Sequence, residues 1–242
     1  MKKTITLVVA CGVLALVAVP AHAAHAAPKD PVSALKATMT PGHGVRFTDT
    51  VTWGDGLDEM GARDAKGTFQ FGKKGVAAFE LTMDYGDERE RVISIGRTGY
   101  YSGGVLEGVL PKGKTWLKSV GGAIPDSWAQ WLNPAEPTTL AALMKKGARS
   151  GNAVTGSITL KELKAVSAWV AAAGVGKEYD GIKMSYTLTL GSSGLVNRLR
   201  TSYTITQDGK LNEVTVDSRY TGWGAKVSIK APDPSTVTTR YR

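Results

Sequence analysis

The chain has 242 residues, of which 30 are basic and 21 acidic, and it carries a formal net charge of +9. It contains one cysteine and three histidines, too few for a disulfide framework or a cysteine–histidine zinc site. The composition does not shift sharply anywhere along the chain, so we interpret the sequence after its leader as one large domain.

Residues 1–26 have the features of a signal peptide. Two lysines precede an apolar run at 5–19, and "AHAAHAA" offers two cleavage sites of the small-x-small kind. We expect cleavage after Ala23 or Ala26 and a secreted protein. Cleavage removes two lysines, so 28 basic residues face 21 acidic residues and the charge becomes +7.

Cys11 stands in "LVVACG", which locally resembles a lipoprotein cleavage box. Cleavage there would follow an unusually short apolar stretch and would leave "GVLALVAV" on the mature protein. We therefore interpret Cys11 as a residue of the signal core rather than a lipid anchor.

The first half of the mature chain predicts a short helix followed by strands. Residues 30–40 offer an Asp cap, a proline in the first turn and apolar residues at helical spacing. Alternation of apolar and polar residues, broken by glycine-rich or charged turns, then predicts strands. The strands are expected at residues 45–53, 67–72, 76–85, 90–96 and 99–110.

The second half mixes helices with more strands. We expect a helix near 126–132, which would be capped by Asp126 or Ser127, and a second from Thr138 or Thr139. A third is expected over 160–174. Further strands are expected at 152–163, in a hairpin at 183–205, and at 210–220 and 225–232. The total is about ten antiparallel strands and three or four helices, because most connections are too short for crossover helices.

The hairpin at 183–205 raises the question of what covers its apolar face. Met184, Tyr186, Leu188 and Leu190 share one face because strand side chains alternate. Two sheets could bury such faces in a sandwich. Alternatively, one strongly twisted sheet could curl into an unclosed half-barrel, with helices in its opening and room left for an apolar ligand.

The order of these elements and several motifs resemble the actinobacterial lipoproteins of the LppX/LprG type. The motifs are "PKGKTWLKS" (111–119), "VTGSITLKEL" (154–163), "GLVNRLRTSY" (194–203) and "YTGWGAKVSIKAPDPSTV" (220–237). That family is similar to the LolA and LolB carriers and RseB-type sensors. The resemblance implies one LolA-like half-barrel domain over 27–242, mainly β, that binds an acylated lipid or lipoprotein in the cell envelope. The sequence departs from the family where "AHAAHAA" replaces the usual lipobox cysteine.

Candidate ligand contacts follow from the expected inward positions and the helical cap. The wall candidates are Phe79, Leu81, Met83, Ile93, Ile95, Met184, Tyr186 and Leu188. The cap candidates are Trp128, Trp131, Leu132, Leu140, Leu143 and Met144. The alternative for each is ordinary core packing, which apolar residues at these spacings usually serve.

An enzyme is the rival class, and the sequence supports it little. His43 is the histidine that remains after the leader is removed, and no G-x-S-x-G elbow accompanies it. The acidic cluster at 84–90 could supply a carboxylate pair, but dense charge between strands usually marks a solvated turn. We therefore predict no catalytic residues, no metal and no cofactor.

A third interpretation is a structural or polymer-binding module that uses the basic surface. Its basic points are Lys73, Lys74, Lys145, Lys146, Arg198 and Arg200. Their partners would be anionic wall polymers or lipid head groups. Nucleic acid is not expected because the basic residues are not interleaved with exposed aromatic side chains. We expect a monomer.

Overall fold

The computed structural model describes residues 30–242, except for 55–58, 87, 122–129 and 208. The predicted signal peptide at 1–26 lies outside the described residues. Among the described residues, no helix has both the length and the apolar character needed to cross a bilayer.

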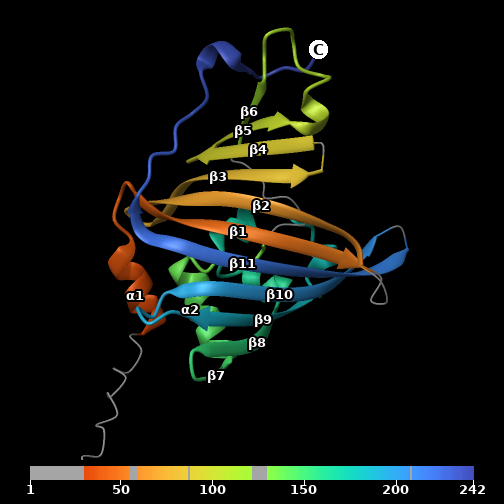
Figure 1. Cartoon of the computed structure of the whole chain (residues 1–242). Coiled ribbons are helices and arrows are strands. Elements are labelled where there is room, and N and C mark those ends of the chain that lie inside the picture. Colours follow the sequence, from red (N-terminus) through yellow and green to blue (C-terminus); the bar gives the residue numbers. More distant parts are fainter. Residues whose placement is uncertain (1–29, 55–58, 87, 122–129, 208) are drawn as a thin grey trace, which may run out of the picture.

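One curved sheet dominates the molecule (Figure 1). Within the described residues it has twelve strands in the order β12-β6-β5-β4-β3-β2-β1-β11-β10-β9-β8-β7, and its two outermost strands do not pair with each other. All neighbours are antiparallel except β12 and β6. The expected unclosed antiparallel sheet is thus confirmed, with two strands more than the ten expected. The strands are β1 (His43–Gly54), β2 (Glu59–Gly72), β3 (Gly75–Tyr85), β4 (Glu88–Ile95), β5 (Thr98–Gly103), β6 (Trp116–Val120), β7 (Ala148–Ser150), β8 (Ala153–Thr159), β9 (Lys183–Leu190), β10 (Val196–Gln207), β11 (Lys210–Lys226) and β12 (Val237–Thr238).

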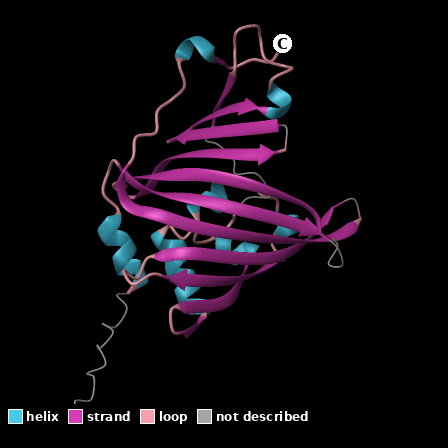
Figure 2. Cartoon of the chain, viewed as in Figure 1, coloured by secondary structure: helices cyan, strands magenta, loops and turns pink. Residues whose placement is uncertain are grey.

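The helices between β6 and β9 gather on one face of the sheet (Figure 2). The α-helices are α1 (Pro31–Thr38), α2 (Pro137–Lys146), α3 (Leu160–Lys164) and α4 (Ala168–Ala172). The 3₁₀ turns are η1 (Gly104–Leu106), η2 (Lys177–Tyr179) and η3 (Pro234–Thr236). The predicted N-terminal helix is confirmed, and the carboxylate of Asp30 caps it by accepting from the Ser33 amide at 2.8 Å.

The strand register decides which residues face the helices. Directly paired residues in antiparallel strands point to the same face. Phe69 pairs with Val45 and with Phe79, and all three are buried in the main hydrophobic core. We call this the concave face, and the opposite one the outer face.

The hairpin at 183–205 is confirmed as β9 and β10. Met184, Tyr186, Leu188 and Leu190 are all 2% exposed or less and lie on the concave face. Single-sided alternation was therefore a sound guide to burial here.

Several element predictions were wrong. The strand expected at 210–220 continues through Lys226 as β11, whereas residues 227–232 of the strand expected at 225–232 form no strand. The strand expected at 99–110 ends at Gly103 and is followed by η1. The expected helix over 160–174 is broken into α3 and α4, because the Ser167 hydroxyl accepts from the Val170 amide and starts a new helix.

The C-terminal segment after β11 returns to the far edge of the sheet. The Ile229 amide donates to the Gln70 side chain at 2.7 Å, and Val237 pairs with Trp116 in the parallel β12–β6 contact. The segment therefore supplies the outermost strand beside β6.

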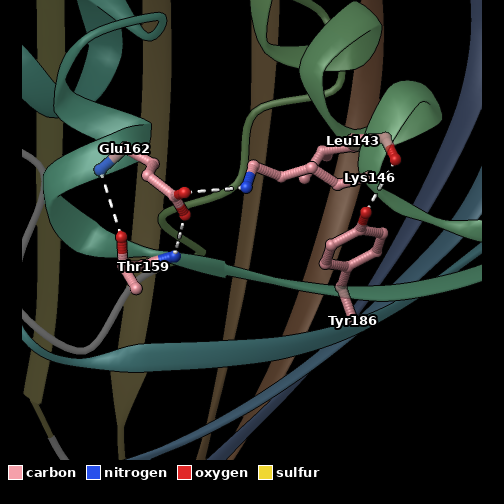
Figure 3. Close-up of polar contacts among 5 residues, drawn as sticks. All are labelled: Leu143, Lys146, Thr159, Glu162 and Tyr186. Atoms are coloured by element: carbon pink, nitrogen blue, oxygen red, sulfur yellow. Dashed lines mark hydrogen bonds and ion pairs between the residues drawn. The ribbon is translucent and has the colours of Figure 1, made fainter.

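The last turn of α2 docks directly on the concave face (Figure 3). The buried Tyr186 hydroxyl donates to the Leu143 carbonyl at 2.6 Å. Lys146 forms an ion pair with Glu162 at 2.7 Å, and Glu162 also completes a capping box with Thr159. These contacts tie α2 to β8, β9 and α3.

Gly156→Ala tests this docking. A Cβ at Gly156 would lie 2.5 Å from the Tyr186 hydroxyl and 2.9 Å from the Gly147 backbone, so α2 would have to move. We expect the free energy of unfolding to fall by about 1–3 kcal/mol, as overpacking costs, measured by urea denaturation. Ser157→Ala, on the opposite face of the same strand, should change it by less than about 0.5 kcal/mol. Equal effects of the two changes would contradict the docking geometry.

Candidate functional site

The candidate site is the interface between the concave face and the helices. We define the lid as residues 130–147, which include α2, and residues 160–182, which include α3, α4 and η2. Leu140 and Leu163 of the lid are 1% exposed or less and belong to the same core as the sheet residues. The lid therefore seals the described part of this interface with apolar side chains.

Trp169 of α4 lies at the aromatic centre of the interface. Its ring meets Phe69 edge-on at a centroid distance of 5.4 Å and Phe79 at 4.8 Å. Phe47 stacks on Phe69 at 4.7 Å on the other side. Such geometries add about 0.5–1.5 kcal/mol per pair beyond area burial. Trp169 thus occupies the most aromatic part of the concave face.

Gln130 connects the lid to the middle of the sheet. Its amide donates to the Ser218 hydroxyl at 3.0 Å and accepts from the Thr201 hydroxyl at 3.1 Å. Its carbonyl accepts from the Trp169 indole at 3.2 Å. One buried residue therefore links two sheet strands and both parts of the lid.

Glu136 joins the two parts of the lid to each other. Its buried carboxylate accepts from the Thr139 hydroxyl at 2.9 Å, the Ser167 hydroxyl at 2.5 Å and the Trp169 amide at 2.8 Å. These charge-assisted hydrogen bonds fix the start of α2 against the start of α4. Any movement of the lid would therefore carry both of its parts together.

Asp49 is a carboxylic acid in the apolar interior. It occupies an inward position of β1 opposite Ser218 and is 4% exposed. Burial raises its pKa to about 7, against smaller lowering effects from Ser218 and Arg63. Asp49 Oδ1 and the buried Asn133 Nδ2 have no hydrogen-bond partner among the described residues. Burial and the nearby Asp49 also raise the pKa of Tyr220.

A small cavity lies between the described parts of the lid and the sheet. It borders Asp49, Asn133 and Trp169 and has a volume of about 10 Å³, enough for about one water molecule. An acyl chain would need far more room than this cavity offers.

Most of the predicted wall residues do lie on the concave face. Phe79, Leu81, Met83, Met184, Tyr186 and Leu188 are each buried in the main core. The placement of Ile93 and Ile95 was wrong. Ile93 pairs with Glu80, and Val92 pairs with the inward Leu81, so Ile93 and Ile95 face outward.

The predicted cap is only partly as expected. Leu132, Leu140 and Leu143 are 1% exposed or less, and Trp131 and Met144 pack against the core at partial burial. Trp128 lies outside the described residues.

We expected a helix that presents Trp131 and Leu132. This prediction was wrong for residues 130–132, which are not helical. The Gln130 side chain accepts from the Leu132 amide, and Asn133 accepts from the Ala135 amide. These local hydrogen bonds, together with the proline after Asn133, replace helical ones.

Sequence reasoning missed the central residues Trp169, Gln130 and Asp49. The burial of Asp49 could have been predicted from the sequence. In the alternating pattern of β1, Asp49 stands between Phe47 and Val51, at a position whose side chain faces inward. A charged residue at such a position is seldom buried without a role or partner. Gln130 offered no comparable signal, because its contacts with Thr201 and Ser218 span 71 and 88 residues.

Comparison with known proteins gave weak likenesses only. The chain matches no model of a known protein family, and no curated protein matches it. Among solved structures it is similar to a LolA superfamily protein, NE2245, from Nitrosomonas europaea, with 6% identity over 79% of this chain and 90% of that one and a TM-score of 0.35. It is also similar to a porin-like protein from Bacteroides uniformis, with 11% identity over 76% of this chain and 97% of that one and a TM-score of 0.29.

The chain spans only 27% of a transferrin binding protein, TbpB, from Neisseria meningitidis, to which it is similar with 11% identity, 79% of this chain covered and a TM-score of 0.28. At such TM-scores these likenesses say nothing about function.

Asp49→Asn tests the buried carboxyl. Its folded pKa of about 7 exceeds the unfolded value of 3.8, so the folded state binds the extra proton between these values. Wild-type stability should therefore fall as pH rises from about 4 to about 7, by an amount on the order of 1–4 kcal/mol. Asp49→Asn should lack this component. Urea denaturation at pH 5 and pH 8 measures it, and identical pH dependence in the two proteins would contradict the assignment.

Proposed function

We propose that the protein is a non-enzymatic binding protein for an acylated lipid or lipoprotein, acting as a carrier or sensor in the cell envelope. The acyl chain would lie on the concave face, beneath the lid. The observation that carries this proposal is the lid–sheet interface: an extended apolar face covered by short, separate helices and attached at its centre by a few polar contacts.

The concave face offers the chemistry that an acyl chain needs. Phe47, Phe69 and Phe79 form a continuous aromatic row across three neighbouring strands. Burial of apolar surface contributes roughly 25 cal/mol per Å² whether the covering group is a lid side chain or a ligand. A bound chain could therefore replace Trp169 at little net cost.

A polar cluster lies beneath the lid. Asp49 and Asn133 border the small cavity there, and each has a buried polar atom with no hydrogen-bond partner among the described residues. A polar group of a ligand beneath the lid could bond to these atoms.

The resemblance of the sequence motifs to those of LppX/LprG-type proteins supports the same proposal, since that resemblance implies a half-barrel that binds acylated ligands. The signal peptide would place the protein outside the cytoplasmic membrane. A carrier of this kind needs no catalytic residues, cofactor or metal, and we propose none.

Trp169→Ala provides the test. In an acyl-binding protein, removal of this ring should create room on the aromatic row, so palmitate should bind more tightly than to wild type and should raise the melting temperature. In a core that excludes ligand, the same change should only destabilise, by about 3–5 kcal/mol. Native mass spectrometry with added palmitate and thermal unfolding distinguish the two outcomes.

Trp223→Ala is the matched control. Trp223 is half-buried, stacks on Tyr220 at 5.9 Å and lies on β11 rather than on the lid. The Trp223→Ala variant should be less stable than wild type and should not bind palmitate more tightly. The proposal would be overturned if neither wild type nor Trp169→Ala bound palmitate and an organic extract of the purified protein contained no lipid.

A further inference from the structure

The outer face carries a polar trough of about 500 Å³ at the middle of the sheet. It runs over β11, β1, β2 and β3. Four threonines with short side chains line it, and longer charged side chains surround them. We define the threonine trough by these lining residues: Arg46, Thr48, Lys66, Thr68, Glu80, Thr82, Arg219 and Thr221.

Three cations of the trough have no ion-pair partner in the part of the chain that the structure describes. The ion pairs found there include none formed by Arg46, Lys66 or Arg219. The acidic residue of the trough, Glu80, is already paired with Arg91 at 2.7 Å. The trough therefore presents a net positive charge that no carboxylate of the described chain neutralises by direct contact.

The position of Arg219 works against folding. It lies directly opposite Arg198 in the β10–β11 register, and like charges at such positions destabilise a sheet. Asp217 compensates Arg198, to which it is joined by two hydrogen bonds. Asp217 also attracts Arg219 at longer range, but Arg219 forms no direct ion pair with a described residue, so its guanidinium is available to an anionic partner.

The three cations surround one threonine. Thr48 pairs with Arg219 on one side and with Lys66 on the other, and Arg46 is two residues away on the same strand and face. Neighbouring strands lie about 4.8 Å apart, so the backbones of Arg219 and Lys66 are separated by about 10 Å. Guanidinium, ammonium and hydroxyl groups at this spacing can contact successive anionic groups of one extended chain.

We propose that the threonine trough binds a linear polymer of phosphate groups, separately from the acyl site on the concave face. Arginine and threonine donors match the non-bridging oxygens that each phosphate of such a polymer exposes. A membrane surface fits less well, because the exposed large hydrophobic residues, such as Val105, Val120 and Leu211, do not line the trough. Nucleic acid fits less well because the lining offers no exposed aromatic ring for base stacking; Phe47, which borders it, is 6% exposed.

The basic points chosen from sequence do not form this site. The trough is not lined by Lys73, Lys74, Lys145, Lys146 or Arg200. Arg198 does not line it either, although it pairs with Arg219 in the sheet. The strand register, rather than clustering along the chain, brings the three cations together.

The test uses the triple variant Arg46→Gln, Lys66→Gln, Arg219→Gln and sodium polyphosphate of defined length as the probe. We expect wild type to bind polyphosphate with an affinity that falls as salt increases. The triple variant should bind about tenfold more weakly, since it lacks three cations that would contact phosphate groups, and its affinity should depend less steeply on salt. Isothermal titration calorimetry at several salt concentrations measures both quantities.

The matched control removes three exposed lysines that belong neither to the trough nor to the lid: Lys73→Gln, Lys74→Gln, Lys112→Gln. It lowers the net charge equally and should bind polyphosphate within about twofold of wild type. Both triple variants should keep the wild-type circular dichroism spectrum and palmitate binding, so that this result is independent of the acyl site.

Equal loss in the two triple variants would overturn the proposal in favour of general charge attraction. Equal or tighter binding of poly-glutamate, single-stranded DNA or anionic phospholipid vesicles would overturn the choice of a phosphate polymer. Wild-type binding that the trough substitutions leave unchanged would overturn the site itself.

Discussion

The whole structure depends on covering one face of an open, curved sheet. The twelve strands within the described chain are not closed into a barrel, so the apolar concave side cannot be hidden by the sheet alone. Each fully buried large apolar side chain there contributes roughly 1.5–3 kcal/mol while an apolar group covers it. Covering the concave face, which the lid does in this structure, therefore contributes to the stability of the fold.

Local periodicity was enough to predict most of the sheet. The alternation in β1, β3, β9 and β10 marks strands and also identifies which side chains are buried, because one face of each packs on the lid and the other meets solvent or polar side chains. The helix at α1 was predictable because its cap and its first-turn proline lie within the helix start itself. These features need no knowledge of distant residues.

Features that depend on distant residues escaped prediction. In β4, Val92, Ile93 and Ile95 are all apolar, so the sequence does not indicate which phase faces inward; the pairing of Val92 with Leu81 decides it. The lid centre is similar, since Gln130 and Trp169 acquire their roles only when strands far along the chain come beneath them.

The two proposed sites constrain the same strands. In β1, Arg46 and Thr48 face outward to the threonine trough, while Phe47 and Asp49 face inward to the lid. Because side chains alternate with a period of two, a one-residue slip of β1 would exchange these faces and place Arg46 among the aromatic side chains. A single register therefore positions both sites. The trough lies on paired strands and takes no lining residue from the lid.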